Sequence, residues 1–231
     1  MTGAGDAVFR PVRAGNAFEE TVERLLQAIR LGVVGAGERL PPERELAERL
    51  GISRVTLREA LRALADAHYV ESRRGRYGGT FVMATLPEPV TGDRRPELED
   101  TLSLRYVLET GAAELAAGQA LKPAAREHLT ATLADASAAS LGDYRTRDSR
   151  LHLAIAEVTG SASLTSAVAD VRMRVNRLLD EIPLLEPNLD HSNTQHEAVV
   201  NAILTGNAQA ARQAMAEHLD GTASLLRAFL T

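Results

Sequence analysis

The stretch Ser53–Ala67, SRVTLREALRALADA, decides the fold of the N-terminal part of the chain. A serine side chain accepts hydrogen bonds from the free N–H groups at the start of a helix, so Ser53 is expected to be the N-cap. Three leucines recur at helical spacing and predict one buried face. They are Leu57, Leu61 and Leu64. Arg54 and Arg58 are four residues apart on a neighbouring face, so both side chains are expected to project from the first turns of this helix.

Two more helices are predicted before this stretch, and a hairpin is predicted after it. Apolar residues at helical spacing indicate a helix over 17–31, and a second helix lies between Pro42 and Gly51. Two short β-prone runs within 69–82 surround a basic turn, RRGR at 73–76, and predict a hairpin. This order is typical of a winged helix-turn-helix, in which one helix enters the major groove of DNA and the hairpin contacts phosphates or the minor groove.

The remainder of the chain predicts helices without strands. Apolar periodicity favours helices over about 98–118, 123–139, 143–158, 163–182, 192–205 and 207–229. Short breaks between them indicate an all-α antiparallel helical bundle. The fold class is therefore mainly α, with an N-terminal winged helix-turn-helix of three helices and a small β-hairpin wing. The expected segments are a flexible tail (1–17), a DNA-binding domain (18–83), a linker (84–97) and an all-helical domain (98–231).

Composition narrows the class of protein. The 231 residues include no cysteine, which excludes disulfides and thiolate metal sites. The sequence shows no secretion signal and no apolar run long enough to cross a bilayer, so we expect a soluble, cytoplasmic protein without a membrane partner. Residues 1–83 carry 13 arginines against 11 acids, whereas the rest of the chain carries 13 basic residues against 20 acids. This asymmetry indicates a nucleic-acid-facing N-terminal end.

Four polar residues in the predicted bundle form a candidate metal site. Asp148 and His152 are four residues apart and share one helical face. His196 and His218 lie on apolar stripes of two other helices, so both are expected to face the interior. A shared divalent cation would satisfy all four groups, because carboxylate oxygen and neutral imidazole suit zinc, nickel or manganese. The alternative is that each histidine is buried with a hydrogen bond of its own, and the residues alone leave both readings open.

The first domain resembles the GntR family of bacterial regulators over most of residues 18–83. The matching segments are GERLPPERELA (37–47), SRVTLREAL (53–61) and RGRYGGTFV (74–82). The resemblance implies operator contacts from seven residues. They are Arg44, Arg54 and Arg58 on bases or phosphates, Ser53 and Thr56 on phosphate, and Arg74 and Gly75 in the wing. The chain departs from the family at Pro42, which replaces a helix-capping serine, and at His68, which replaces a glycine and is expected to strain its turn.

The second domain is similar to the FCD ligand-binding domain of the FadR subfamily. The spacing of the four candidate ligands carries this resemblance, together with LRYVLE (104–109) and QHEAV (195–199). It implies that Asp148, His152, His196 and His218 hold a divalent metal ion beside a bound organic acid. Zinc is the metal we expect first, and nickel and manganese are the alternatives. Candidate effector contacts are Arg105, Arg172 and Asn176. Exposure on the surface is the alternative for Arg105 and Arg172, and Arg105 could also pair with Glu109.

Three functions remain in view. The first is a DNA-binding transcriptional regulator, a repressor more often than an activator, which binds double-stranded operator DNA as a homodimer and responds to a small carboxylate. The second is a metalloenzyme that a nucleic-acid-binding domain targets. No His-Glu-x-x-His motif or general base supports it, so no catalytic residues are assigned. The third is a dimerisation module in which the histidines have no function.

Overall fold

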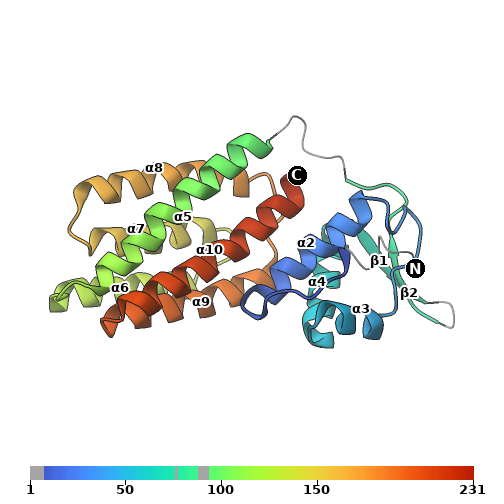
Figure 1. The fold of residues 1–231 in the computed structure, drawn as a ribbon, viewed down its shortest axis with the longest axis horizontal. Coiled ribbons are helices and arrows are strands. Elements are labelled where there is room, and N and C mark those ends of the chain that lie inside the picture. Colours follow the sequence, from blue (N-terminus) through green and yellow to red (C-terminus); the bar gives the residue numbers. More distant parts are fainter. Residues whose placement is uncertain (1–7, 76–77, 88–93) are drawn as a thin grey trace. The chain divides into compact units, whose positions relative to one another are not determined.

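The structure, a computed structural model, describes residues 8–75, 78–87 and 94–231. These residues form two compact units (Figure 1). Unit 1 runs up to Arg94 and includes Gly221–Thr231, and unit 2 is Arg95–Asp220. Within the described part of the chain, no helix combines the length and apolar content needed to span a membrane. The predicted segment limits stay predictions, and 88–93 of the predicted linker lie outside the described residues.

Unit 1 has the predicted order of helices and strands. Its elements are η1 (Ala14–Asn16), α2 (Ala17–Arg30), α3 (Glu43–Leu50), α4 (Arg54–Asp66), β1 (Val70–Arg73) and β2 (Gly79–Val82). The strands are antiparallel, with Val70 opposite Val82, and Arg39 forms an isolated bridge with Phe81. Helix α4 packs against α2, α3 and β1. The predicted winged helix-turn-helix is confirmed.

Helix α4 begins as its sequence predicts. Ser53 is the N-cap, and its Oγ accepts a hydrogen bond from the backbone N–H of Thr56 at 3.0 Å. The predicted leucine face is buried, which leaves the side chains of Arg54 and Arg58 56% and 59% exposed. Helix α3, in contrast, has Pro42 at its N-cap and no side-chain hydrogen bond there. The helix that carries the predicted base-contacting residues is thus the better capped of the two.

Part of the predicted N-terminal tail is packed. Val8 and Phe9 are buried, and the N–H of Val12 donates a hydrogen bond to the carbonyl of Leu50 at 3.0 Å. Two apolar residues among glycines and alanines have no periodicity, so the sequence pattern does not reveal that they are buried. Residues 1–7 of this predicted tail lie outside the described residues.

The turn between α4 and β1 is strained at His68. Among the described residues it is the only non-glycine with a positive φ, at +62°. A Cβ in the left-handed region costs roughly 1 kcal/mol, and the exposed imidazole offers no packing in return. We expect His68→Gly to raise the free energy of unfolding by about 1 kcal/mol, measured as a higher urea midpoint with an unchanged slope. A lower midpoint would mean that the imidazole makes a stabilising contact.

Unit 2 is a helical bundle, as predicted (Figure 1). Its helices are α5 (Arg95–Ala117), α6 (Pro123–Ser137), α7 (Tyr144–Glu157), α8 (Ala162–Leu179), α9 (Glu186–Leu204) and α10 (Ala208–Leu230), the last of which belongs to this unit as far as Asp220. Alanine, valine and leucine fill the core, in which Leu151, Val168 and Val199 are fully buried. Small aliphatic side chains allow the helices to pack closely around the polar cluster described below.

Helix α9 begins six residues earlier than the predicted start at 192. It starts at Glu186 and has Pro187 in its first turn. The helices predicted over 163–182 and 192–205 leave Pro187 in the break between them. A backbone N–H in the first turn of a helix has no acceptor within the helix. Proline, which lacks this N–H, therefore loses no hydrogen bond there and is tolerated. The additional residues bury Leu189.

The last residues of α10 belong to unit 1. A Cβ on Gly221 would lie 2.7 Å from Oδ1 of Asn16, so only glycine lets these two segments come this close without displacing the asparagine. Arg30 donates hydrogen bonds to the carbonyls of Ala228 and Phe229. These contacts satisfy carbonyl groups that lack partners at the end of a helix.

Candidate nucleic-acid interface and metal centre

The residues predicted to contact DNA lie on unit 1, at the starts of α3 and α4 and in the turn after β1. Six of the seven are exposed, and Thr56 is half-buried. The exposed six are Arg44, Ser53, Arg54, Arg58, Arg74 and Gly75. Gly75 has φ +104°, a conformation that favours glycine. Arg76, also in the predicted basic turn, lies outside the described residues.

A hollow lined by arginines lies between these helices and the hairpin. The lining arginines are Arg39, Arg44, Arg54 and Arg73. The guanidinium of Arg39 lies against Gly79, where a Cβ would clash with it. Clustered guanidinium groups are suited to phosphate, because they donate paired hydrogen bonds. Arg39 was not predicted as a site residue, and Arg73 was predicted only as part of the basic turn of the wing. The bridge of Arg39 to β2 and the pairing of β1 with β2 bring the two arginines together here.

Glu43, the first residue of α3, contacts Arg54 and Arg58, two of the three arginines predicted to contact bases or phosphates. Its Oε2 lies 2.8 Å from Nε of Arg58 and 3.7 Å from Nη2 of Arg54. Exposed ion pairs of this kind add little stability. The Glu43 carboxylate does, however, place a negative charge on the surface that would face DNA phosphates. We therefore expect Glu43 to oppose phosphate binding while it orients the two guanidinium groups.

Removing this charge should loosen the discrimination between DNA sequences. We expect Glu43→Gln to strengthen binding to an unrelated duplex roughly 3- to 10-fold, because a negative charge no longer faces the phosphates. Operator binding should stay within about 2-fold, because there the same gain is offset by the loss of the contacts that orient Arg54 and Arg58. Fluorescence anisotropy with a selected operator and a scrambled duplex, at two salt concentrations, measures both affinities. The control is Glu48→Gln, which removes an exposed charge from the same helix. Equal affinities for Glu43→Gln and the wild type on both duplexes would contradict this role.

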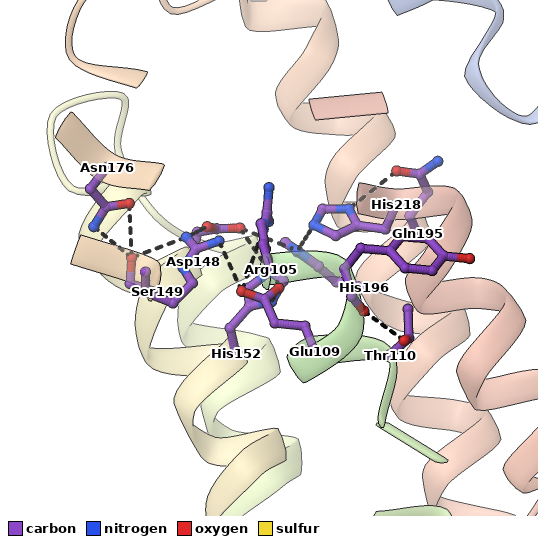
Figure 2. Close-up of polar contacts among 12 residues, drawn as sticks. Arg105, Glu109, Thr110, Asp148, Ser149, His152, Asn176, Gln195, His196 and His218 are labelled. Atoms are coloured by element: carbon purple, nitrogen blue, oxygen red, sulfur yellow. Dashed lines mark hydrogen bonds and ion pairs between the residues drawn. The ribbon is translucent and has the colours of Figure 1, made fainter. Parts of the chain in front are cut away.

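The four predicted metal ligands lie together in unit 2. Asp148 and His152 come from α7, His196 from α9 and His218 from α10, and one ligand atom of each lies within 4.8 Å of the others. Oδ1 of Asp148 is 3.2 Å from Nε2 of His196 and 3.6 Å from Nε2 of His152. The two Nε2 atoms of His196 and His218 are 3.2 Å apart. Figure 2 shows these side chains converging from three helices.

These separations fit one divalent ion. Ligand atoms about 2.0–2.1 Å from a tetrahedral zinc ion lie roughly 3.3 Å from each other. The three imidazoles are at most 2% exposed, so bulk solvent does not reach their facing nitrogens. Nε2 of His152 has no hydrogen-bond partner, and only one proton can lie between Nε2 of His196 and Nε2 of His218. A carboxylate and three imidazoles are the kinds of ligand that zinc, nickel and manganese accept.

Two further residues orient the histidines. Oε2 of Glu109 lies 2.7 Å from Nδ1 of His152, and Oε1 of Gln195 lies 3.2 Å from Nδ1 of His218. A proton held on each Nδ1 leaves Nε2 with its lone pair directed into the cluster, as metal-binding histidines require. From the sequence, Glu109 was expected only as a partner of Arg105, and Gln195 had no predicted role. The one feature of the sequence that points to Glu109 is its position one helical turn after Arg105, on the same face of the helix.

Burial and neighbouring charges set the protonation of this cluster. Burial raises the pKa of Glu109, but Arg105 and His152 outweigh it and lower the pKa to about 2. Burial likewise opposes ionisation of Asp148, yet Arg172 and His152 bring its pKa well below the usual range. Burial lowers the pKa of His196 and that of His218, the latter strongly. An ionised Asp148 beside neutral His196 and His218 is the protonation state that a metal ion needs.

The predicted effector contacts separate into two kinds. Arg105 and Arg172 are both 2% exposed, so the surface alternative is wrong for both. Arg105 pairs with Glu109 at 3.3 Å, as the alternative pairing predicted, and Arg172 pairs with Oδ2 of Asp148. Asn176 lies farther out, where its Nδ2 donates to Oγ of Ser149 at 3.0 Å (Figure 2). Asn176 thus contacts Ser149, the residue that follows Asp148 in the sequence, and no hydrogen bond joins it directly to a candidate metal ligand.

Comparison with known proteins gives matches for both parts of the chain. Residues 18–82 match the family described as "Bacterial regulatory proteins, gntR family", and residues 100–221 match the FCD domain. An Escherichia coli (strain K12) protein, named as a regulator of an L-lactate dehydrogenase operon, is 32% identical, over 91% of this chain and 86% of its own length. The Uxu operon transcriptional regulator of the same strain is 32% identical, over 84% of this chain and 80% of its own.

Among solved structures, the fold is similar to that of E. coli McbR/YncC. The TM-score is 0.51 at 22% identity, over 90% of this chain and 96% of that one. This likeness concerns the fold alone. The two family matches and the similarity to named operon regulators settle the class: the chain belongs to the GntR family of bacterial regulators, has an FCD domain, and is a DNA-binding transcriptional regulator and not an enzyme.

Proposed function

We propose that this regulator is a homodimeric repressor whose unit 2 binds one divalent metal ion and a small organic acid. Asp148, His152, His196 and His218 would hold the metal ion, with zinc the leading choice and nickel or manganese the alternatives. When bound, the ion supplies a positive charge that can attract an anionic ligand. Unit 1 would contact the operator through α4 and the hairpin, and two copies would read two half-sites.

The observation that supports an anionic effector is the charge of the buried cluster. Arg105 and Arg172 contribute two positive charges, and Glu109 and Asp148 contribute two negative ones, all at 8% exposure or less. The two arginines and the two carboxylates balance each other until a divalent ion adds two positive charges. A buried excess of charge is costly. A carboxylate would remove part of that excess, whereas a neutral ligand of the same shape would not.

Unpaired donors beside the cluster support the same ligand class. Nη1 of Arg105 and both Nε and Nη1 of Arg172 are buried without hydrogen-bond partners. A buried N–H without an acceptor costs about 1–3 kcal/mol. Carboxylate oxygens are the acceptors that guanidinium groups bind best. The L-lactate dehydrogenase operon named for one relative adds support, since L-lactate is a small carboxylate.

A thermal-shift experiment tests this proposal with a neutral analogue as the control. Metal-loaded and chelator-treated protein are each titrated with L-lactate, with lactamide and with a panel of mono- and dicarboxylates. We expect some carboxylate to stabilise only the metal-loaded protein, by about 2.7 kcal/mol at 100 times its Kd. Lactamide should have no effect. Equal shifts from amide and acid, or shifts that survive chelation, would contradict an anion bound beside the metal.

A further inference from the structure

Helix α4, all of whose residues the structure describes, has a single large apolar side chain on its surface. This side chain is that of Val55, the second residue of the helix, which is 64% exposed. The three leucines of α4 are buried. Valine forms helices less well than alanine, because its branched side chain is restricted at χ1, and a side chain this exposed buries little apolar area. Folding therefore gives no reason for a valine at this position.

Val55 projects from α4 in the direction away from the core. A helix has 3.6 residues per turn, so Val55 and Leu64, nine positions later, are separated by about 2.5 turns. Leu64 is fully buried, so Val55 lies on the opposite side of the helix. Arg58, Glu59 and Arg62 follow Val55 at helical spacing and are exposed. Val55 is thus an apolar side chain among charged ones on the outermost face of α4.

The two arginines at the start of α4 are directed to one side of this face. Arg58 and Arg54 both contact Glu43 of α3, at 2.8 and 3.7 Å. Val55 follows Arg54 directly, so it projects about 100° farther round the helix. At 64% exposure its side chain stays open to solvent beside the two guanidinium groups. The first turns of α4 therefore present two groups of hydrogen-bond donors and, next to them, one apolar contact.

We propose that Val55 contacts the C5-methyl group of one thymine in each operator half-site and thereby determines which base is accepted there. The inference rests on the proposed function in one respect, that α4 is the helix that reads the operator. Residues in the first turns of such a helix reach base edges in the major groove. Thymine differs from the other bases there by its methyl group, which apolar side chains contact.

The chemistry of valine excludes the other partners that DNA offers to α4. Phosphate oxygens and the remaining base edges present hydrogen-bond donors and acceptors, and a valine side chain has neither. Ser53 and Thr56, on either side of this position, carry the hydroxyl groups predicted to contact phosphate. A cytosine at the same place would bury its amino group against Val55 without an acceptor, which is costly. Val55 therefore favours thymine and also disfavours cytosine.

The test removes the methyl group from the DNA. An operator is first selected from random duplexes with the wild-type chain, and each thymine is then replaced in turn by deoxyuridine, in both half-sites together. Deoxyuridine keeps every hydrogen-bonding group of thymine and lacks only the C5-methyl. Burial of one such group corresponds to about 4-fold in affinity, so substitution at the contacted thymine should weaken binding roughly 15-fold over two half-sites. Fluorescence anisotropy measures each affinity.

A valine variant shows whether Val55 makes that contact. Val55→Ala should weaken binding to the thymine operator about 10-fold or more, and in this variant the deoxyuridine substitution should cost less than about 3-fold. Such non-additivity indicates a direct contact. Because valine carries no charge, the salt dependence of binding and the affinity for a scrambled duplex should match the wild type. The urea midpoint should be unchanged or higher, since alanine is the better helix former.

Leu31→Ala is the matched control variant. Leu31 lies at the C-cap of α2 and is 65% exposed, so the variant removes a similarly exposed apolar side chain from the same unit. It should bind the thymine operator within about 2-fold of the wild type and lose the same factor, roughly 15-fold, on the deoxyuridine substitution. Deoxyuridine at thymines that Val55 does not contact should cost less than about 2-fold in every variant.

Two outcomes would overturn the inference. In the first, no deoxyuridine substitution weakens binding of the wild-type chain by more than about 2-fold. In the second, one substitution does so but costs Val55→Ala the same factor. If Arg54→Ala/Arg58→Ala still weakens operator binding in either case, α4 remains the reading helix and only the contact of Val55 is wrong. If that double variant binds the operator like the wild type, the assignment of α4 fails and the inference fails with it.

Discussion

Replacing both Arg54 and Arg58 with alanine is expected to weaken operator binding about 100-fold or more. Both side chains project from the first turns of α4 and are more than half exposed. An arginine that reads a base edge contributes about 1–3 kcal/mol to discrimination, and a dimer would lose four such contacts. Binding to unrelated DNA should fall less, because it depends on phosphate contacts spread over the whole DNA-facing surface of unit 1 and not on base edges. Fluorescence anisotropy with a selected operator and a scrambled duplex measures both.

The control removes the same charge from elsewhere on the chain. Arg126→Ala/Arg150→Ala takes two positive charges from exposed positions of α6 and α7 in unit 2 and should leave both affinities nearly unchanged. If the Arg54→Ala/Arg58→Ala variant bound the operator like the wild type, α4 would not be the helix that reads bases.

Replacing His196 and His218 with alanine is expected to abolish metal binding. The pair supplies two of the four candidate ligands, and their Nε2 atoms face each other at 3.2 Å. Metal content measured by mass spectrometry should fall from about one ion per chain to nearly none. Structural zinc sites bind with about 10–16 kcal/mol, so chelation should lower the melting temperature of the wild type and leave that of the variant unchanged.

A histidine outside the cluster provides the matched control. His128 is exposed on α6 and pairs with Glu157, so His128→Ala should retain both the metal and the response to chelator. Full metal occupancy in the His196→Ala/His218→Ala variant would mean that the ion binds elsewhere.

The features that sequence predicts here are those that local chemistry controls. Ser53 caps α4 because its side chain reaches its own helix, and the leucine stripe is buried because its spacing leaves one apolar face. The same periodicity predicted that His196 and His218 face inward, and both are buried. The fold class followed from such local signals, and the structure confirms it.

The features that sequence missed depend on contacts between distant segments. Arg172 of α8 is buried beside a carboxylate of α7, and helical spacing cannot reveal a partner on another helix. Spacing did predict the pairing of Arg105 with Glu109, but it did not predict that the pair is buried. Gln195 orients His218 across two helices. The early start of α9 has a local cause, since a proline breaks a helix interior but is accepted in the first turn.

Regulation requires that the two units communicate. Helix α10 supplies His218 to unit 2 and its last residues to unit 1, so one continuous helix contributes to both. An effector changes operator affinity only if it binds one state of the protein better than another. A coupling free energy of about 1–3 kcal/mol would change operator affinity roughly 5- to 150-fold.

Calorimetric titration of the metal-loaded protein with L-lactate, or with the carboxylate that gives the largest thermal shift, tests this coupling most directly. The titration is run with and without saturating operator DNA. Linkage requires that DNA change the carboxylate affinity by the same factor by which the carboxylate changes DNA affinity. For a repressor released by its effector, we expect the carboxylate to bind about 5- to 150-fold more weakly in the presence of operator. Equal affinities in the two titrations would contradict a regulator controlled through this metal centre.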